Sequence, residues 1–175
     1  ILAGVDTDPY AIETFKRTHE GTSTICREIE KVTATQLMEI AGIGSGQLTC
    51  LIGGPPCQAF SVYNHKRGFH DNRSGLFRHY LRLVQELSPK SVVMENVMGI
   101  LSMGNGQAVD EIKYELSELG YQVDVCILKA EDYGVPQERR RVFFIGTKSE
   151  FGIPKLEPQY GEEGQPPFVS VWDAI

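Results

Sequence analysis

The chain has 175 residues, 41% of them hydrophobic and 23% charged, and this ordinary globular composition excludes a disordered, collagen-like or disulfide-scaffold protein. The length fits one domain rather than two. Seventeen lysines and arginines against 23 aspartates and glutamates give a net charge of −6, which argues against a protein that simply coats nucleic acid. No apolar run approaches the ~20 residues of a membrane span, so we expect no membrane partner. The four cysteines show no paired CxxC spacing, so no metal site is expected.

The predicted elements alternate between strands and helices. Short apolar runs typical of buried strands stand at 1–5, 22–26, 48–52, 91–95, 121–129 and 141–147. Apolar residues at helical spacing, or start signals such as Asp8-Pro9, predict helices that begin near Asp8, Ala34, Ser74 and Val109. Strands that alternate with helices form mostly parallel sheets with helices on both faces, so we predict an α/β fold. Ligands of such sheets bind at the carboxyl ends of the strands.

A Gly-Gly-Pro-Pro-Cys-Gln turn follows the strand at 48–52. Glycines let the backbone approach a ligand closely, and prolines stiffen the turn. A single cysteine is more often buried as core filling, but this turn is a poor place to pack a small apolar side chain. We therefore interpret Cys57 as a nucleophile.

Charged residues stand at two further strand ends. Glu95 ends an apolar strand, where it could act as a proton donor or, equally, lie on the surface as an ordinary acid. Arg139, Arg140 and Arg141 lead into the last predicted strand, and in extended backbone Arg139 and Arg141 point to one face and Arg140 to the other. Two guanidiniums on one face could orient a carboxylate, a phosphate or a base edge, although a solvated charge run is the more common explanation.

A local basic excess also lies between residues 58 and 83. One acid, Asp71, accompanies five cations there, namely Lys66, Arg67, Arg73, Arg78 and Arg82. A solvated surface explains such clusters more often than a site for a polyanion does.

In this order and at these spacings, the motifs resemble the signature of the cytosine-C5 DNA methyltransferase family. The matching segments are Pro-Cys-Gln at 56–58, Glu-Asn-Val at 95–97, and Gln-x-Arg-x-Arg at 137–141, and the segment 69–77 resembles the end of the family's catalytic loop. The resemblance implies a Rossmann-like, S-adenosylmethionine-dependent methyltransferase sheet that is mostly parallel with an antiparallel last strand pair. It also implies methyl transfer to C5 of a cytosine flipped out of double-stranded DNA.

The family's catalytic roles carry over to five residues of this sequence. The resemblance implies that the Cys57 thiolate adds to C6 of the cytosine, which activates C5. Glu95 is expected to interact with N3, and Asn96 to hold the turn at the strand end. Arg141 is expected to contact the cytosine O2, and Arg139 to position Cys57 and Glu95 electrostatically.

The resemblance also implies contacts with the cofactor and with DNA. Asp6 would accept the ribose hydroxyls, Glu28 with Ile29 would read the adenine amino group, and Thr7 stands where many members stack an aromatic side chain on the adenine. The remaining expected cofactor contacts are Pro55 and Leu76. The residues expected to meet DNA are Gln58, Ser61, Lys66, Arg67 and Arg73.

Neither the family's opening Phe-x-Gly-x-Gly loop nor its target-recognition region is found in this sequence. We therefore expect a truncated domain, with residues 1–150 a partial catalytic domain and residues 151–175 a Gly/Pro-rich linker and the start of a following segment. Alone, these residues are expected to bind S-adenosylmethionine weakly. We also expect a cytoplasmic, bacterial or phage-encoded protein of restriction-modification type, with a cognate restriction endonuclease as a partner.

Two alternatives stay open. One is an RNA cytosine-C5 methyltransferase that acts on tRNA, although Ala59-Phe60-Ser61 fits the DNA enzymes better. The other is a catalytically silent DNA-binding homologue, which has no need for the thiol of Cys57.

Overall fold

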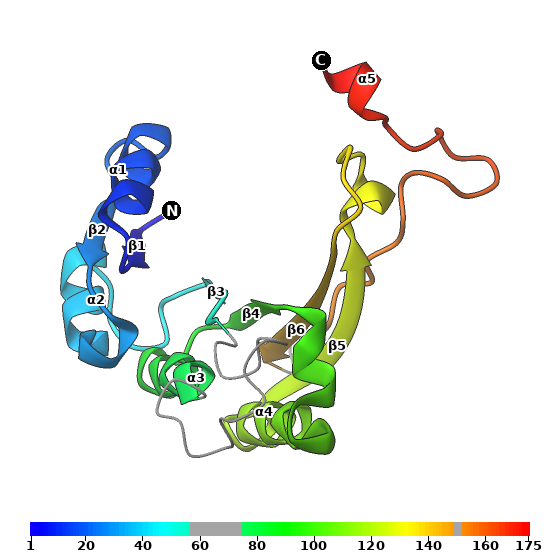
Figure 1. Ribbon diagram of the computed structural model, residues 1–175. Helices are drawn as coiled ribbons and strands as arrows, with labels where there is room; N and C mark the ends of the chain where they lie inside the picture. The colour runs from blue at the N-terminus through cyan, green and yellow to red at the C-terminus, as the bar shows by residue number, and fades with distance from the viewer. Residues whose placement is uncertain (57–74, 149–151) are drawn as a thin grey trace.

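The computed structural model describes residues 1–56, 75–148 and 152–175, whose strands form two sheets (Figure 1). In the first sheet, β1 (Ala3–Asp6) pairs in parallel with β2 (Ser23–Cys26). The second sheet has the order β3-β4-β6-β5, with bounds Cys50–Gly53, Ser91–Asn96, Arg140–Lys148 and Tyr121–Lys129. β3 and β4 are parallel, whereas β6 runs antiparallel to both of its neighbours. The predicted α/β class and the antiparallel last strand pair are thus confirmed.

The α-helices are α1 (Pro9–Thr18), α2 (Ala34–Ala41), α3 (Leu76–Leu87), α4 (Gln107–Glu118) and α5 (Val171–Ala174), and the 3-10 helices are η1 (Ile29–Lys31), η4 (Met98–Gly106) and η5 (Ala130–Tyr133). Three of the described α-helices, α1, α2 and α5, begin at a capping side chain. Asp8 caps α1 by accepting a hydrogen bond from Tyr10 N at 2.8 Å, with Pro9 at the first helical position as predicted. Thr33 opens α2 with a capping box, and Gly42 ends it in the left-handed conformation.

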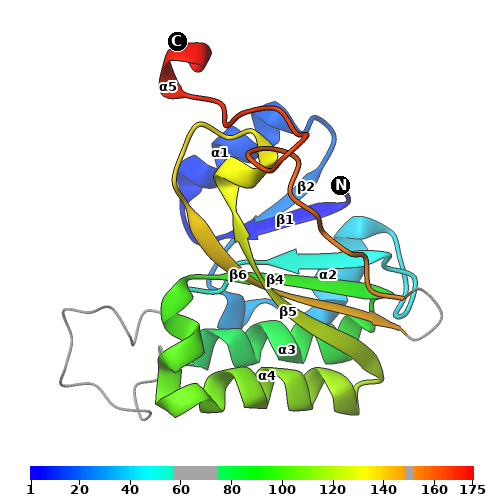
Figure 2. The same ribbon diagram turned by 90° about the vertical axis from the view of Figure 1, so that its right-hand side faces the viewer.

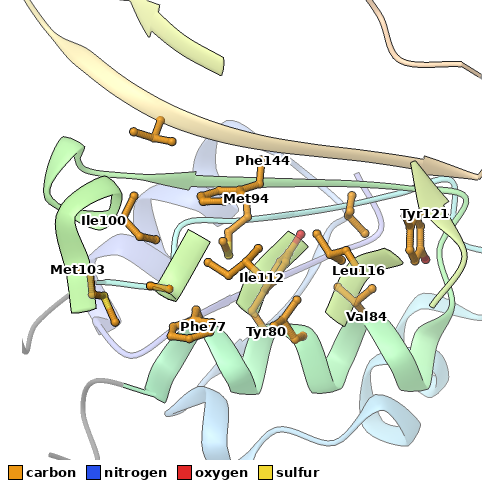
Figure 3. Packing of buried hydrophobic residues seen from close by; sticks show 14 residues of the cluster. Phe77, Tyr80, Val84, Met94, Ile100, Met103, Ile112, Leu116, Tyr121 and Phe144 are labelled. Carbon is orange, nitrogen blue, oxygen red and sulfur yellow. The ribbon is translucent and has the colours of Figure 1, made fainter. Parts of the chain in front are cut away.

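The main core lies between the four-stranded sheet and the helices α3 and α4 (Figures 2 and 3). Alternate residues of β4 and β6 face these helices, and they are Val92, Met94, Val142 and Phe144. Amphipathic faces of α3 and α4 bury Tyr80, Val84, Ile112 and Leu116 against them. Burial of this apolar surface is the chief stabilising contribution to this part of the fold.

The placement of the helices differs from the expectation that they cover both faces of one sheet. Both α3 and α4 pack on the same face of the four-stranded sheet, and on the opposite face Pro154 of the C-terminal segment borders a hollow with Val93 and Ile145. Helix α1 packs on the β1–β2 pair, where the ring of Phe15 lies against Gly4. Alternation of strands and helices along the chain does not state which strands pair, so it cannot separate one sheet from two.

Tyr80 of α3 packs against the two parallel strands β3 and β4. Its hydroxyl lies 3.0 Å from the carbonyl oxygen of Leu51 in β3 and 3.2 Å from that of Val93 in β4. The ring lies so close to Gly53 that a Cβ atom at that position would stand 2.6 Å from it. Glycine therefore ends β3 because the tyrosine ring occupies the space of a side chain.

The described C-terminal segment, residues 152–175, contains no strand. Within it, the backbone N–H groups of Gln159 and Tyr160 both donate to the carbonyl oxygen of Asp132, at 2.8 and 3.1 Å. The described part of the segment ends in the short helix α5. In the described parts of the chain, no helix combines the length and apolar character needed to cross a bilayer. The predicted domain boundary near residue 150 stays a prediction.

Candidate functional site

The carboxyl ends of β3 and β4 bring the glycine-proline turn and Glu95 together. Because the two strands are parallel, their carboxyl ends meet at one edge of the sheet. A Cβ atom built on Gly54 would lie 3.3 Å from the Glu95 Oε2 atom, so the turn passes directly beside this carboxylate. Glycine at this position lets the backbone approach the acid closely.

Arg141 of the neighbouring antiparallel strand β6, and Arg139 just before that strand, face the same carboxylate. Glu95 lies opposite Phe143 in the ladder, so Arg141, two residues before Phe143, projects from the same face of the sheet. Arg141 Nε lies 2.8 Å from Glu95 Oε1, and Arg139 Nη2 lies 3.9 Å from the same oxygen. All three side chains are partly exposed. The arrangement holds a carboxylate in one orientation while leaving it accessible to a ligand.

Asn96 ties the end of β4 to the turn after β3. Its side chain is 4% exposed, and its Nδ2 atom donates a hydrogen bond of 3.0 Å to the carbonyl oxygen of Pro55. Its Oδ1 atom accepts from the backbone N–H of Val97 at 2.9 Å. Both polar ends of this buried amide are thus satisfied, and the path of the chain at Pro55 is fixed.

The proposed nucleophile and the expected DNA contacts lie outside the described residues. Cys57 directly follows Pro56 in the sequence, and it opens the segment 57–74 that the structure does not describe. The other predicted residues in that segment are Gln58, Ser61, Lys66, Arg67 and Arg73. Their roles stay predictions.

Two arginines of the basic cluster, which the sequence left as either solvated cations or part of a polyanion site, are paired with acids. Arg78 forms an ion pair with Glu111 of α4, and Arg82 lies 3.2 Å from Glu86 Oε2 one turn further along α3. The Glu111 carboxylate raises the pKa of Arg78 by hydrogen bonding to its guanidinium. Arg78 thus links α3 to α4, and Arg82 pairs with an acid within α3.

The expected cofactor residues form a second group around β1 and β2. Asp6 ends β1, is exposed, and its Oδ1 accepts from Asp8 N at 2.9 Å. The backbone of Arg27 donates to the Asp6 carbonyl oxygen at 2.9 Å, which holds the ends of β1 and β2 together. Thr7 accepts a weak hydrogen bond from the thiol of Cys26 at 3.6 Å through its own carbonyl oxygen.

Glu28 and Ile29 come directly after β2. Glu28 precedes η1, and its exposed carboxylate lies 2.6 Å from Lys31 Nζ. Ile29 is partly buried and packs against the main core. The exposed carboxylate at the end of β1 has the chemistry that a ribose requires. The acid and the apolar side chain after β2 have the chemistry that an adenine requires. Leu76, the first residue of α3, is half-buried.

Sequence reasoning missed the roles of Tyr80 and Arg82. The helical spacing of apolar residues places Tyr80 on the buried face, but a spacing does not reveal the acceptors of its hydroxyl. Arg82 is one of five cations in the cluster, and the two backbone carbonyls that it binds are 53 and 50 residues away in the sequence. No local signal distinguishes it from a solvated arginine. Among residues 1–56, 75–148 and 152–175, no three His, Cys, Asp or Glu side chains gather as metal ligands would.

Comparison with known proteins gives a consistent result. The family model described as C-5 cytosine-specific DNA methylase matches residues 1–167. The chain is 39% identical to the type II methyltransferase M.XorII of Xanthomonas oryzae, and the match covers 100% of this chain and 40% of that relative. It is 34% identical to the type II methyltransferase M.AquIA of a Picosynechococcus species, over 98% of the chain and 77% of that relative.

A solved structure extends the likeness to the fold. The crystal structure of a putative DNA modification methyltransferase encoded within an Escherichia coli prophage superposes with a TM-score of 0.78 and 29% identity, covering 99% of this chain and 47% of that one. The chain spans less than half the length of several curated relatives that it matches.

Proposed function

Because the chain belongs to the C-5 cytosine-specific DNA methylase family, we propose that it carries the catalytic residues of a DNA cytosine-5 methyltransferase of restriction-modification type. The single observation that carries this proposal is the position of Glu95. It is held by Arg141 at 2.8 Å and lies beside the turn that leads into Cys57. A paired carboxylate beside a stiff turn that leads in the sequence to a cysteine suits an addition reaction on a ring.

Each proposed catalytic residue has a defined part in this chemistry. The Cys57 thiolate adds to C6 of a cytosine, and electron density moves towards C5 and N3. Glu95 protonates N3 or donates a hydrogen bond to it, which relieves the negative charge that develops on the ring. Arg141 fixes the Glu95 carboxylate and reaches the O2 edge of the base, while Arg139 adds a second positive charge. Asn96 keeps the turn before Cys57 at a fixed distance from Glu95 through its bond to Pro55.

The family uses S-adenosylmethionine, and residues around β1 and β2 fit this cofactor. Asp6 offers an exposed carboxylate to the ribose hydroxyls, and Glu28 with Ile29 offers an acid and an apolar contact to the adenine. Leu76 and Pro55 complete the proposed contacts, and Thr7 provides no aromatic ring to stack. When bound, S-adenosylmethionine would supply the electrophilic methyl group that the activated C5 takes, and S-adenosylhomocysteine would be the leaving group. Loss of the C5 proton to a base and departure of the Cys57 thiolate from C6 would then restore the aromatic ring and the free enzyme.

The proposed substrate is double-stranded DNA, from which the target cytosine must be extruded at a cost of a few kcal/mol. Residues of the segment 57–74 are the proposed phosphate contacts, and they include Ser61, Lys66, Arg67 and Arg73. A restriction endonuclease that cuts at the same site is the proposed biological partner.

The test is methylation in a cell. The full-length protein is expressed in a methylation-free host, with Cys57→Ser alongside, and the plasmid is sequenced after bisulfite treatment. We expect methylation at one defined sequence context that the substitution abolishes. Methylation that persists in Cys57→Ser would refute the proposed nucleophile. No methylation above background would refute a DNA substrate, and tRNA would then be assayed.

A mechanism-based trap separates an enzyme from a silent DNA-binding homologue. A duplex with 5-fluorocytosine at the target position retains the covalent adduct, because fluorine cannot leave C5 as a proton does. We expect a complex that survives denaturation with the wild type and none with Cys57→Ser. DNA binding without any adduct would favour the silent homologue.

A further inference from the structure

Arg82 of α3 joins two segments that are distant in the sequence. Its Nη2 atom donates hydrogen bonds to the carbonyl oxygens of Ile29 at 3.1 Å and of Val32 at 2.8 Å. Its Nη1 atom lies 3.3 and 3.2 Å from the two carboxylate oxygens of Glu86, one turn later in α3. The guanidinium is thus shared between its own helix and the 3-10 turn η1.

Glu86 continues this connection to α2. Its Oε2 atom accepts a hydrogen bond of 3.4 Å from the backbone N–H of Ala34, the first residue of α2. The first N–H groups of a helix have no partner within their own element, and Glu86 supplies one to Ala34. The carbonyl oxygen of Ile29 already accepts from the backbone N–H of Val32 at 3.2 Å, and Arg82 adds a second donor to it. Arg82 and Glu86 therefore bind backbone groups on both sides of the junction between η1 and α2.

Hydrophobic packing holds the same junction from inside. Val32 is fully buried in a small cluster with Ala34, Leu37, Leu83 and Leu87. Side chains of such a cluster fix how close α3 and η1 lie, but apolar contacts are not directional. The charged hydrogen bonds of Arg82 supply the direction, because a guanidinium presents its donors in a rigid fork.

The residues set by this connection are Glu28 and Ile29. Glu28 is the residue before η1, and Ile29 is its first residue, whose carbonyl oxygen is one of the two acceptors of Arg82. η1 has no side-chain cap of its own, and its remaining ion pair, Glu28 with Lys31, is exposed on both sides. An exposed pair of this kind contributes little to holding a carboxylate in place.

We propose that Arg82 is a positioning residue for cofactor recognition, because it fixes the turn that aims Glu28 and Ile29 at the adenine. This inference rests on the proposed function, which assigns the adenine contact to that pair. Arg82 itself touches no cofactor atom in this assignment. It acts through the backbone of η1, on the selectivity of the site for the adenine amino group.

The experiment measures ligand selectivity in the full-length protein. S-adenosylhomocysteine is compared with S-inosylhomocysteine, which replaces the adenine amino group with an oxygen, by calorimetric titration of wild type and Arg82→Met. We expect the wild type to prefer the adenosyl ligand and Arg82→Met to bind it about tenfold more weakly, the loss expected for displaced charged hydrogen bonds. The affinity of Arg82→Met for the inosyl ligand and for DNA should stay within about twofold of the wild type.

Two further variants exclude a purely structural role. Arg78→Met removes another arginine of the same helix, which pairs with Glu111 rather than with η1, and it should leave the selectivity unchanged. Arg82→Lys keeps the positive charge without the rigid fork, so it should restore part of the preference. Its affinity for the adenosyl ligand should be about threefold below that of the wild type. Should Arg82→Met fail to fold, the lysine variant decides, because a selectivity equal to that of the wild type would overturn the inference.

The outcomes separate this inference from the proposed function. A wild type that binds neither ligand refutes the cofactor assignment itself. A wild type that prefers the adenosyl ligand, with Arg82→Met showing the same preference, overturns only the inference. Equal losses for both ligands and for DNA would make Arg82 a general structural residue, which also overturns it.

Discussion

At the scale of single residues, the site consists of a carboxylate with two unequal arginine neighbours. Arg141 makes the close contact with Glu95, whereas Arg139 is more than 1 Å further from the same oxygen. Coulombic interaction falls with distance, and directed hydrogen bonding falls faster. Arg141 should therefore dominate the orientation of the acid.

Replacement of the arginines one by one tests this difference. We expect Arg141→Ala to lower the single-turnover rate of methyl transfer about 100-fold, as loss of a directed donor does at other sites, and Arg139→Ala to lower it about 10-fold. Arg140→Ala is the matched control, because Arg140 projects from the other face of β6, and it should change the rate less than about twofold. A larger effect at Arg139 than at Arg141 would contradict the geometry.

Asn96 provides a second test at this scale. Asn96→Ala leaves the Pro55 carbonyl oxygen unpaired in a buried place, which should lower the free energy of unfolding by about 1–3 kcal/mol in a urea titration. Asn96→Asp puts an acceptor against an acceptor and should lower it at least as much. An unchanged free energy of unfolding in both variants would show that water replaces the amide without cost.

The sequence predicts these residues unequally well. Turn residues and strand ends locate the Gly-Gly-Pro-Pro turn, Glu95 and the Arg139/Arg141 face, because strand alternation is a local property. That the three segments meet follows from pairing between β3, β4 and β6, which no local pattern specifies. The acceptors of Asn96 and Arg82 lie about 40 to 50 residues away, so they could only be observed.

At the scale of elements, α3 connects the two parts of the molecule. The Tyr80 hydroxyl contacts backbone carbonyls of β3 and β4, and Arg82 binds backbone carbonyls of η1 and of Val32 after it. Burial raises the pKa of Tyr80 well above its usual range, so the hydroxyl keeps its proton and remains a donor. In the unfolded chain the same group titrates near its ordinary pKa of about 10.

Tyr80→Phe tests the contribution of this hydroxyl. We expect the free energy of unfolding to fall by about 1 kcal/mol at pH 7, since two strand carbonyls lose a donor. Because the pKa of Tyr80 is raised by folding, wild-type stability is full below pH ~10 and decreases above it, and the phenylalanine variant should decrease less. Parallel pH dependence in both proteins would contradict the burial of the hydroxyl.

Element boundaries follow from the sequence more closely than element pairing does. The predicted strands at 91–95 and 121–129 correspond to β4 and β5, and the capped helix at Asp8-Pro9 corresponds to α1. The 3-10 helices η1 and η4 escape prediction because η1 spans only three residues and η4 is interrupted by non-helical backbone at 103–105, so neither leaves a periodic pattern. Separation of β1–β2 from the other strands also escapes it, since sheet order depends on contacts between distant residues.

At the scale of the whole molecule, both sheets present open edges in the described part of the chain. β1 and β2 pair only with each other, and β3 pairs with β4 on one side. Ile52, in the edge strand β3, is 73% exposed. Unpaired strand edges with apolar side chains are templates for association with other strands.

Self-association of the 175-residue chain should therefore depend on Ile52. We expect Ile52→Lys to reduce concentration-dependent association in sedimentation velocity, because a lysine on an edge strand opposes further pairing. Tyr10→Lys is the control, since Tyr10 is 82% exposed but lies on α1 rather than on a strand edge. Equal reductions in the two variants would show that general charge, rather than the edge, controls association.

The position of β6 determines when the site can first exist during synthesis. β6 is the last strand in the described part of the chain, yet it lies between β4 and β5, so β5 leaves the ribosome before the strand with which it pairs. Arg139 and Arg141 arrive together with that strand. A nascent chain consequently holds Glu95 without its guanidinium neighbours until the four-stranded sheet closes, and the charged site and the completed sheet appear in the same step of translation.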